Sequence, residues 1–211
     1  MNILHVIANP KPADEAHSKQ LGDAFFKALK ARQPGVQVTE VDLYKNPPPY
    51  YDNETYRHFW YPVFDAAYKP SEKEKAAVKY ALAQCELFNK ADVLVLTTPM
   101  WNFGVPAILK AWLDQVLIPN VTFAIGKGGV KGLHHIRKVV VLASSGGTYA
   151  VGDLRDGIRN GITATMGFAG IIDIDVVWSQ GQNPFFFQDH AERHAKAVRE
   201  AVALGEKVAA L

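Results

Sequence analysis

Short apolar runs alternate with longer amphipathic segments along the chain, and this alternation predicts an α/β fold. Five runs are typical of strands because they are short, rich in Val, Leu and Ile, and bounded by turn-forming residues. They occupy residues 2–9, 36–44, 92–98, 136–145 and 171–181. The third run, "DVLVLTT", is apolar without alternation, which is typical of a strand buried on both faces of a parallel sheet.

Segments with helical spacing separate the strands and are expected at residues 18–35, 71–91, 105–117, 153–170 and 189–211. The first places Leu21, Phe25 and Leu29 on one face, and the second opens with Ser71 and Glu74 as a capping box. Strands that alternate with helices form parallel sheets covered by helices on both faces. The pattern predicts a single domain over residues 1–211, with a flavodoxin-like, doubly wound, five-stranded parallel sheet in the order 2-1-3-4-5.

Residues 44–70 interrupt this alternation. They are rich in Pro and aromatic residues and show neither the helical nor the strand period. At about 27 residues the segment is longer than the usual loop, which favours a functional excursion or an interaction surface. The alternative is a surface excursion that packs on its own rings.

Composition limits the possible partners and the compartment. The chain has 211 residues, 48% hydrophobic and 21% charged, with a net charge of +2, so nothing favours nucleic acid or a membrane surface as a partner. No apolar run approaches the roughly 20 residues that span a bilayer, and the N-terminus lacks signal-peptide features. The one cysteine, Cys85, lies on an apolar helix stripe and is expected to be a buried structural thiol. A cytoplasmic location fits these features.

Ligands of such sheets bind beyond the carboxyl ends of the strands, where the strand order reverses. The loops at 9–18, 99–106 and 144–150 are therefore expected to border one crevice. The first places Ser18 at the N-cap of a helix, where the free N–H groups favour a phosphate, although an ordinary cap serine explains the residue equally well. Neither the dinucleotide fingerprint nor the P-loop motif is present.

The loop "PMWNFGVP" at 99–106 places large apolar side chains in a turn, where small and polar residues are usual. Either the turn belongs to the core, or it faces a flat ligand with a few polar edges. Asn102 offers both a donor and an acceptor to such an edge, and Gly104 permits an unusual backbone angle. The loop beginning at Ser144 has little side-chain bulk, although its Gly146-Gly147 pair alone is typical of a plain turn.

The strand followed by "PMWNFGVPAILKAWLDQV", then "NVTF" and "SSGGTY", resembles the FMN-dependent NADH azoreductase and NAD(P)H quinone reductase family of flavodoxin-like fold. The resemblance implies FMN as the cofactor and identifies the residues that hold it. These are Asn9, His17, Ser18, Pro99, Met100, Trp101, Asn102, Phe103, Ser144, Ser145, Gly146 and Gly147. Two positions depart from the family pattern: Asn9 stands where a serine is common, and Ser145 replaces the usual Arg.

The family resemblance also implies a mechanism and an assembly. NADH or NADPH delivers two electrons and leaves, and a quinone or azo compound then takes them in a ping-pong cycle that needs no catalytic side chain. Family members are homodimers with active sites at the interface, and residues 44–70 would form a wall of the partner's pocket. The implied contacts with small aromatic acceptors are Tyr50, Tyr51, Phe59, Trp60, Phe64 and Tyr149.

Other functions remain open on sequence grounds. An FMN reductase would release reduced flavin, and a flavodoxin would carry electrons without an organic substrate, although flavodoxins are usually strongly acidic. A flavin-free relative would keep only the fold.

Two groups of charged residues are given structural interpretations. His190 and His194 have metal-ligand spacing but no third ligand, so a solvated helix face is expected and no metal. Basic residues near the fourth strand are expected to form a solvated rim, with a contact to an anionic cofactor as the alternative. They are Lys127, Lys131, Arg137 and Lys138.

Overall fold

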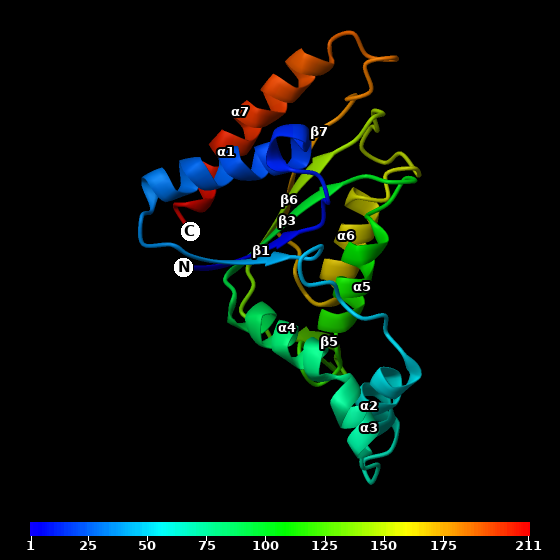
Figure 1. Ribbon diagram of the computed structural model, residues 1–211. Helices are drawn as coiled ribbons and strands as arrows, with labels where there is room; N and C mark the ends of the chain where they lie inside the picture. The colour runs from blue at the N-terminus through cyan, green and yellow to red at the C-terminus, as the bar shows by residue number, and fades with distance from the viewer.

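A five-stranded parallel sheet forms the centre of the protein. The computed structural model describes all residues 1–211, and the strand order is β2-β1-β3-β6-β7 (Figure 1). The strands are β1 (Asn2–Ile7), β2 (Gln37–Asp42), β3 (Val93–Pro99), β6 (Lys138–Ser144) and β7 (Ile174–Ser179). The predicted order 2-1-3-4-5 is confirmed, and the chain reverses its direction of winding between β1 and β3.

Helices cover both faces of this sheet, as predicted. They are α1 (His17–Arg32), α2 (Asn53–Phe64), α3 (Glu72–Ala77), α4 (Lys79–Lys90), α5 (Ala107–Val116), α6 (Arg159–Phe168) and α7 (His190–Val208), with a short 3-10 helix η1 (Ala13–Glu15) before α1. Figure 1 shows α1 and α7 on one face and α4, α5 and α6 on the other. No helix is both long enough and apolar enough to span a bilayer.

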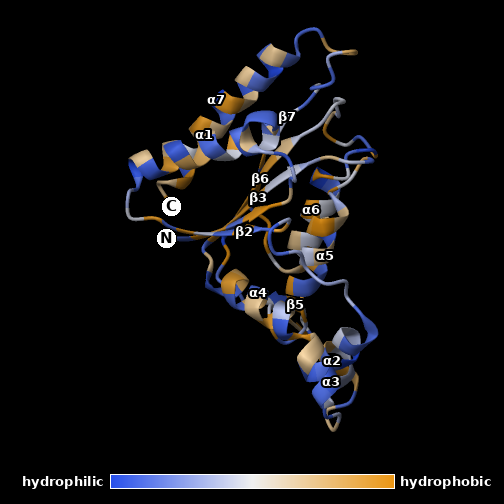
Figure 2. Cartoon of the chain, in the orientation of Figure 1, coloured by the Kyte–Doolittle hydropathy of each residue, from blue (hydrophilic) through white to orange (hydrophobic).

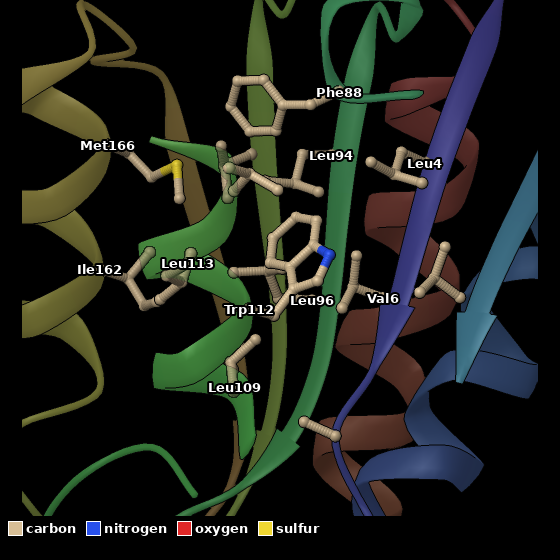
Figure 3. Close-up of a cluster of buried hydrophobic side chains, with 14 of the residues drawn as sticks. Leu4, Val6, Phe88, Leu94, Leu96, Leu109, Trp112, Leu113, Ile162 and Met166 are labelled. Atoms are coloured by element: carbon tan, nitrogen blue, oxygen red, sulfur yellow. The ribbon is translucent and has the colours of Figure 1, made fainter. Parts of the chain in front are cut away.

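Two apolar clusters hold these layers together. The residues of β3 and β6 are buried along their whole length, so their side chains supply both clusters. Figure 2 shows the resulting apolar colouring of the central strands and of the helix sides that face them. On the α4–α6 side, Trp112 lies among Leu94, Leu96 and Leu109 (Figure 3), and its Nε1 donates to Gln84 Oε1 at 3.0 Å.

Segment 44–70 contains α2, which the sequence pattern did not reveal. Asp52 caps the helix by accepting a hydrogen bond from the Thr55 N–H at 2.8 Å, and Pro62 lies within the helix. Proline and closely spaced aromatic residues obscured the period, because Pro is expected to break helices and rings occur on several sides. The correct signal was the Asp52 cap.

Side-chain hydrogen bonds join α2 to α3. Arg57 Nε and Tyr68 Oη both donate to Glu74 Oε1 at 2.7 Å, and the Ser71–Glu74 capping box forms as predicted. The Tyr68 hydroxyl and the Arg57 guanidinium lower the pKa of Glu74 to about 2. In Figure 1 the two helices project from the body of the sheet.

Other expectations needed smaller corrections. The predicted helix 71–91 divides at Val78, and the helix expected at 153–170 covers only α6. A hairpin of β4 (Phe123–Gly126) and β5 (Gly129–Gly132) was not anticipated.

The sequence predicts a solvated environment for Lys138 and a buried one for Cys85, and only the second prediction is confirmed. Lys138 does not belong to a solvated rim: it is 3% exposed, and its Nζ contacts Asp173 Oδ1 at 2.6 Å and Asp175 Oδ2 at 2.9 Å. A buried ammonium needs such partners, which a sequence pattern does not reveal. Cys85 is buried as predicted, and burial raises the pKa of its thiol to about 12.

The close contact between α1 and α7 depends on Gly205. A Cβ at this position would lie 2.4 Å from the carbonyl oxygen of Phe25. Overpacking of this kind costs about 1–3 kcal/mol, so Gly205→Ala is expected to lower the free energy of unfolding by about that amount. Urea denaturation would measure it.

Gly161 provides the matched control, because it lies in α6 with nothing within 4 Å of an added Cβ. Gly161→Ala is expected to leave stability unchanged or raise it by up to about 1 kcal/mol, since Ala favours helices over Gly. Equal effects of the two substitutions would contradict the close α1–α7 contact.

Candidate functional site

A cavity of about 310 Å³ lies at the carboxyl edge of the sheet, where the loops after β1, β3, β6 and β7 meet. It is lined by Asn9, Lys11, Glu15, Ala16, His17, Pro99, Met100, Trp101, Ser144, Ser145, Gly146, Gln182 and Asn183. The three loops expected to border one crevice therefore do so. Of the predicted cofactor residues, only Ser18, Asn102, Phe103 and Gly147 lie outside this lining.

Ser18 was wrongly predicted to be the N-cap of the first helix. The N-cap is Ala16, and Ser18 lies fully buried in the first turn of α1. The Ser18 hydroxyl accepts a hydrogen bond from Asn9 Nδ2 at 2.9 Å, while Asn9 Oδ1 accepts one from the Lys11 N–H at 3.1 Å. Asn9 and Ser18 thus fasten the loop after β1 to the helix.

The N-terminus of α1 has no capping side chain. Ala16 has no side-chain oxygen, and the first intrahelical bond is donated by Gln20 to the carbonyl of Ala16. The N–H groups before Gln20 in this first turn are therefore free to bind an anion at the positive end of the helix dipole. Ala16 and His17 bring this helix end into the wall of the cavity.

The loop after β3 forms a tight turn with an uncommon backbone. The N–H of Trp101 donates to the carbonyl of Gly104 at 2.9 Å, and the reverse bond measures 3.0 Å. Between them Asn102 has φ 47° and Phe103 has φ 66°, as in a type I′ turn. The expectation that Gly104 supplies the unusual angle was wrong: the two side-chain residues adopt it, and Phe103 does so at a cost.

Neighbouring segments hold this turn in place. The N–H of Gly157 donates to the carbonyl of Phe103 at 3.0 Å, and a Cβ on Gly157 would lie 2.1 Å from that oxygen. The N–H of Met100 donates to the carbonyl of Ser144 at 2.7 Å, which joins the turn to the loop after β6. The turn therefore presents Met100 and Trp101 to the cavity from a fixed position.

The loop after β6 is fastened to the segment that follows β7. The Ser145 N–H donates to the carbonyl of Ser179, and the Gln182 N–H donates to the carbonyl of Ser145, both at 3.0 Å. The Ser145 hydroxyl donates to the carbonyl of Gly147 at 2.9 Å. Ser145 therefore shapes the loop and contributes no charge, unlike the arginine usual at this position in the family.

Sequence reasoning missed five residues of the wall: Lys11, Glu15, Ala16, Gln182 and Asn183. The last two follow β7, whose carboxyl end shares the sheet edge with the other strands, so the topology alone could have indicated them. Gln182 is notable because its buried Oε1 has no hydrogen-bond partner, while its Nε2 donates to the carbonyls of Gln180 and His190.

His194 was expected on a solvated helix face, and the structure corrects this. Its ring packs edge-on against His17 with centroids 4.6 Å apart, and its Nδ1 lies 2.9 Å from Ser179 Oγ. The imidazole of His194 therefore extends from α7 toward the start of α1 and the end of β7. No group of three or more His, Cys, Asp or Glu residues has the arrangement of a metal site.

The predicted acceptor contacts occupy different environments. Phe59 is 6% exposed and belongs to the hydrophobic core, which is inconsistent with a role in an open pocket wall. Tyr51 and Trp60 are partly buried against that core, whereas Tyr50 and Phe64 are 84% and 69% exposed. Tyr149 lies near the turn instead: its ring stacks on Trp178 and meets Phe103 edge-on at 6.3 Å.

The left-handed backbone of Phe103 leads to a testable difference in stability. Phe103→Gly and Phe103→Ala both remove the exposed ring, but only glycine adopts this angle without strain. The glycine variant is expected to have a free energy of unfolding about 1 kcal/mol higher than the alanine variant. Urea denaturation of both proteins provides the comparison, and an alanine variant at least as stable would contradict the strained turn.

Comparisons with known proteins agree on one family. The model of the flavodoxin-like fold family matches residues 1–204. FMN-dependent NADH:quinone oxidoreductase 1 of Bacillus licheniformis is 34% identical over 212 residues, which cover 99% of this chain and 98% of that protein. The enzyme of the same name from Alcanivorax borkumensis is 36% identical over 183 residues, covering 87% and 89% of the two chains.

Solved structures give the same result. The crystal structure of azoreductase AzrA has a TM-score of 0.88 at 29% identity and covers 98% of this chain and 100% of that one. An azoreductase from Bacillus anthracis has a TM-score of 0.88 at 28% identity, with 98% and 99% covered. The chain is therefore an oxidoreductase that belongs to the flavodoxin-like family of FMN-dependent NADH:quinone oxidoreductases.

Proposed function

We propose that this protein binds FMN in the cavity at the carboxyl edge of the sheet and uses NADH, or NADPH, to reduce quinones and azo compounds. The observation that carries the proposal is the convergence of the free end of α1 with the turn after β3 and the loop after β6. A helix end able to bind a phosphate and a turn able to hold a flat ring would thus border the same cavity.

The residues present fit the two ends of FMN. At the phosphate end, the uncapped N-terminus of α1 offers N–H donors, and Lys11 and His17 line the wall beside it. At the other end, Met100 and Trp101 would contact the ring system. Gln182 and Asn183 complete the wall from the segment that follows β7.

FMN, when bound, supplies the two-electron chemistry that no side chain of this cavity possesses. In the overall reaction NADH and one proton convert a quinone to a hydroquinone and release NAD⁺, so two electrons and two protons reach the acceptor. The protein binds and orients the reactants. The fixed turn leaves Trp101 45% exposed and Phe103 55% exposed, so flat reactants would stack beside it. NADH and the acceptor would use this face in turn, which is a ping-pong cycle.

The projection formed by α2 and α3 supports a homodimer with the active sites at its interface. Phe64 at the end of α2 and Tyr50 just before this helix are both exposed, so their rings are available for contact with a partner subunit. Within one chain α2 packs on α3 and on the hydrophobic core, and no residue of segment 44–70 lines the cavity. Segment 44–70, without the core residue Phe59, would therefore form part of the acceptor wall of the partner subunit.

The same proposal includes a cytoplasmic location. The chain has one cysteine, so it forms no internal disulfide and is compatible with a reducing compartment.

Initial-rate kinetics test the cycle. If NADH leaves before the acceptor binds, double-reciprocal plots against NADH at several quinone concentrations are expected to be parallel. Intersecting lines would show that both reactants bind together and would contradict the ping-pong cycle. Release of free reduced flavin after NADH is added, with no quinone or azo compound present, would favour an FMN reductase.

Phe64→Ala separates the proposed acceptor wall from the rest of the site. If Phe64 contacts the acceptor in the partner subunit's site, its loss is expected to raise the KM for a quinone about 3- to 30-fold. Because Phe64 is exposed and lies outside the cavity of its own chain, the NADH half-reaction is expected to stay unchanged. An unchanged KM would contradict the role of this segment.

A further inference from the structure

Two histidines from distant parts of the chain meet beside the proposed phosphate end. His17 is the first residue of α1 and lines the cavity, and His194 lies in α7. Their rings are 4.6 Å apart and meet at 69°, and Ser179 Oγ lies 2.9 Å from His194 Nδ1. The contact with His194 therefore fixes where the ring of His17 lies.

The charged surroundings of this pair are mostly basic. On the side of α1 and its preceding loop are Lys11, Glu15 and Lys19, and Lys19 Nζ donates to the carbonyl of Lys11. On the side of α7 are His190 and Arg193, of which Arg193 is paired with Asp189. The wall segments from β3 and β6 contribute no titratable side chain to the cavity.

These surroundings favour neutral imidazoles when no anion is bound. Burial lowers the pKa of His17, and the charges of Lys11 and His190 add to the effect. Burial and the neighbouring His17 lower the pKa of His194. The positive end of the α1 dipole acts on His17 in the same direction.

We infer that His17, held in place by His194 and Ser179, takes up a proton from solvent when a phosphate dianion binds and thereby selects the phosphorylated form of the flavin. The inference rests on the proposed function. A dianion beside the imidazole reverses the balance of charges and stabilises imidazolium. Two protonated rings 4.6 Å apart would repel each other, so the pair accepts one proton and not two.

The selectivity for FMN over riboflavin follows because the phosphate group is what causes the proton uptake. FMN carries a phosphate that is almost fully dianionic above pH 7, whereas riboflavin carries the same ring system without it. The charge on His17 would therefore strengthen FMN binding alone. Because the uptake of one proton changes the affinity by at most about tenfold per pH unit, the effect is moderate and measurable.

Isothermal titration calorimetry of FMN binding to the cofactor-free protein tests this inference. Runs at pH 7 in buffers of different ionisation enthalpy are expected to show uptake of about half a proton. The FMN affinity is expected to fall about twofold between pH 7 and pH 8.5, because a group that is half protonated in the complex and neutral in the free protein at pH 7 doubles the affinity there. Riboflavin is expected to bind more weakly and without proton uptake.

Two matched variants identify the residue that carries the proton. His17→Gln keeps a hydrogen-bonding side chain but cannot titrate, so proton uptake and the pH dependence of the affinity are expected to disappear. His194→Phe keeps an aromatic edge against His17, and the proton uptake is expected to persist. Circular dichroism would establish that both variants are folded.

The outcomes are distinguishable. Equal proton uptake by the wild type and His17→Gln would overturn the inference, as would its loss only in His194→Phe. FMN binding without proton uptake in the wild type would also overturn it while leaving the proposed function intact. Failure of the folded wild type to bind FMN would instead remove the proposed function.

Discussion

The reversal of strand order between β1 and β3 is the constraint on which the site depends. Neighbouring strands on either side of this point send their connections to opposite faces, so the loops beyond β1 and β3 separate and leave a space at the carboxyl edge. The fully buried β3 and β6 keep the loops that follow them in fixed positions. The cavity is therefore a consequence of the winding of the sheet, and the side chains around it determine what it binds.

A side-chain hydrogen bond and a strained turn then shape the cavity wall. Asn9 fastens the first loop to Ser18, and the end of α1 is uncapped because its N-cap residue is Ala16. The turn after β3 stores backbone strain at Phe103, and the close approach of Gly157 holds it. Strain of this kind persists only where the surrounding structure maintains it, and it is common at binding sites. Hydrogen bonds between neighbouring segments thus hold the turn after β3 and the loop after β6 beside the end of α1, as the proposed flavin site requires.

Much of the fold and most of the cavity wall could be predicted from the sequence. The strand order followed from five apolar runs and four intervening helical segments, because hydrophobic periodicity reflects burial directly. The loops at 99–106 and 144–150 were located by the same topology. Features that depend on tertiary contacts were not predictable: the partnership of Lys138 with Asp173 and Asp175, and the packing of His194 on His17. Helix α2 was missed because Pro62 and neighbouring rings obscure its period.

The absorbance spectrum of the purified protein, recorded before and after anaerobic addition of NADH, tests the central claim most directly. The account predicts flavin bands near roughly 375 and 450 nm, present on purification or after addition of FMN, which bleach with NADH. Bands that persist with both NADH and NADPH would indicate an electron carrier. The absence of bound flavin even after addition of FMN would contradict the account and make the turn at 99–106 a packing element of the fold.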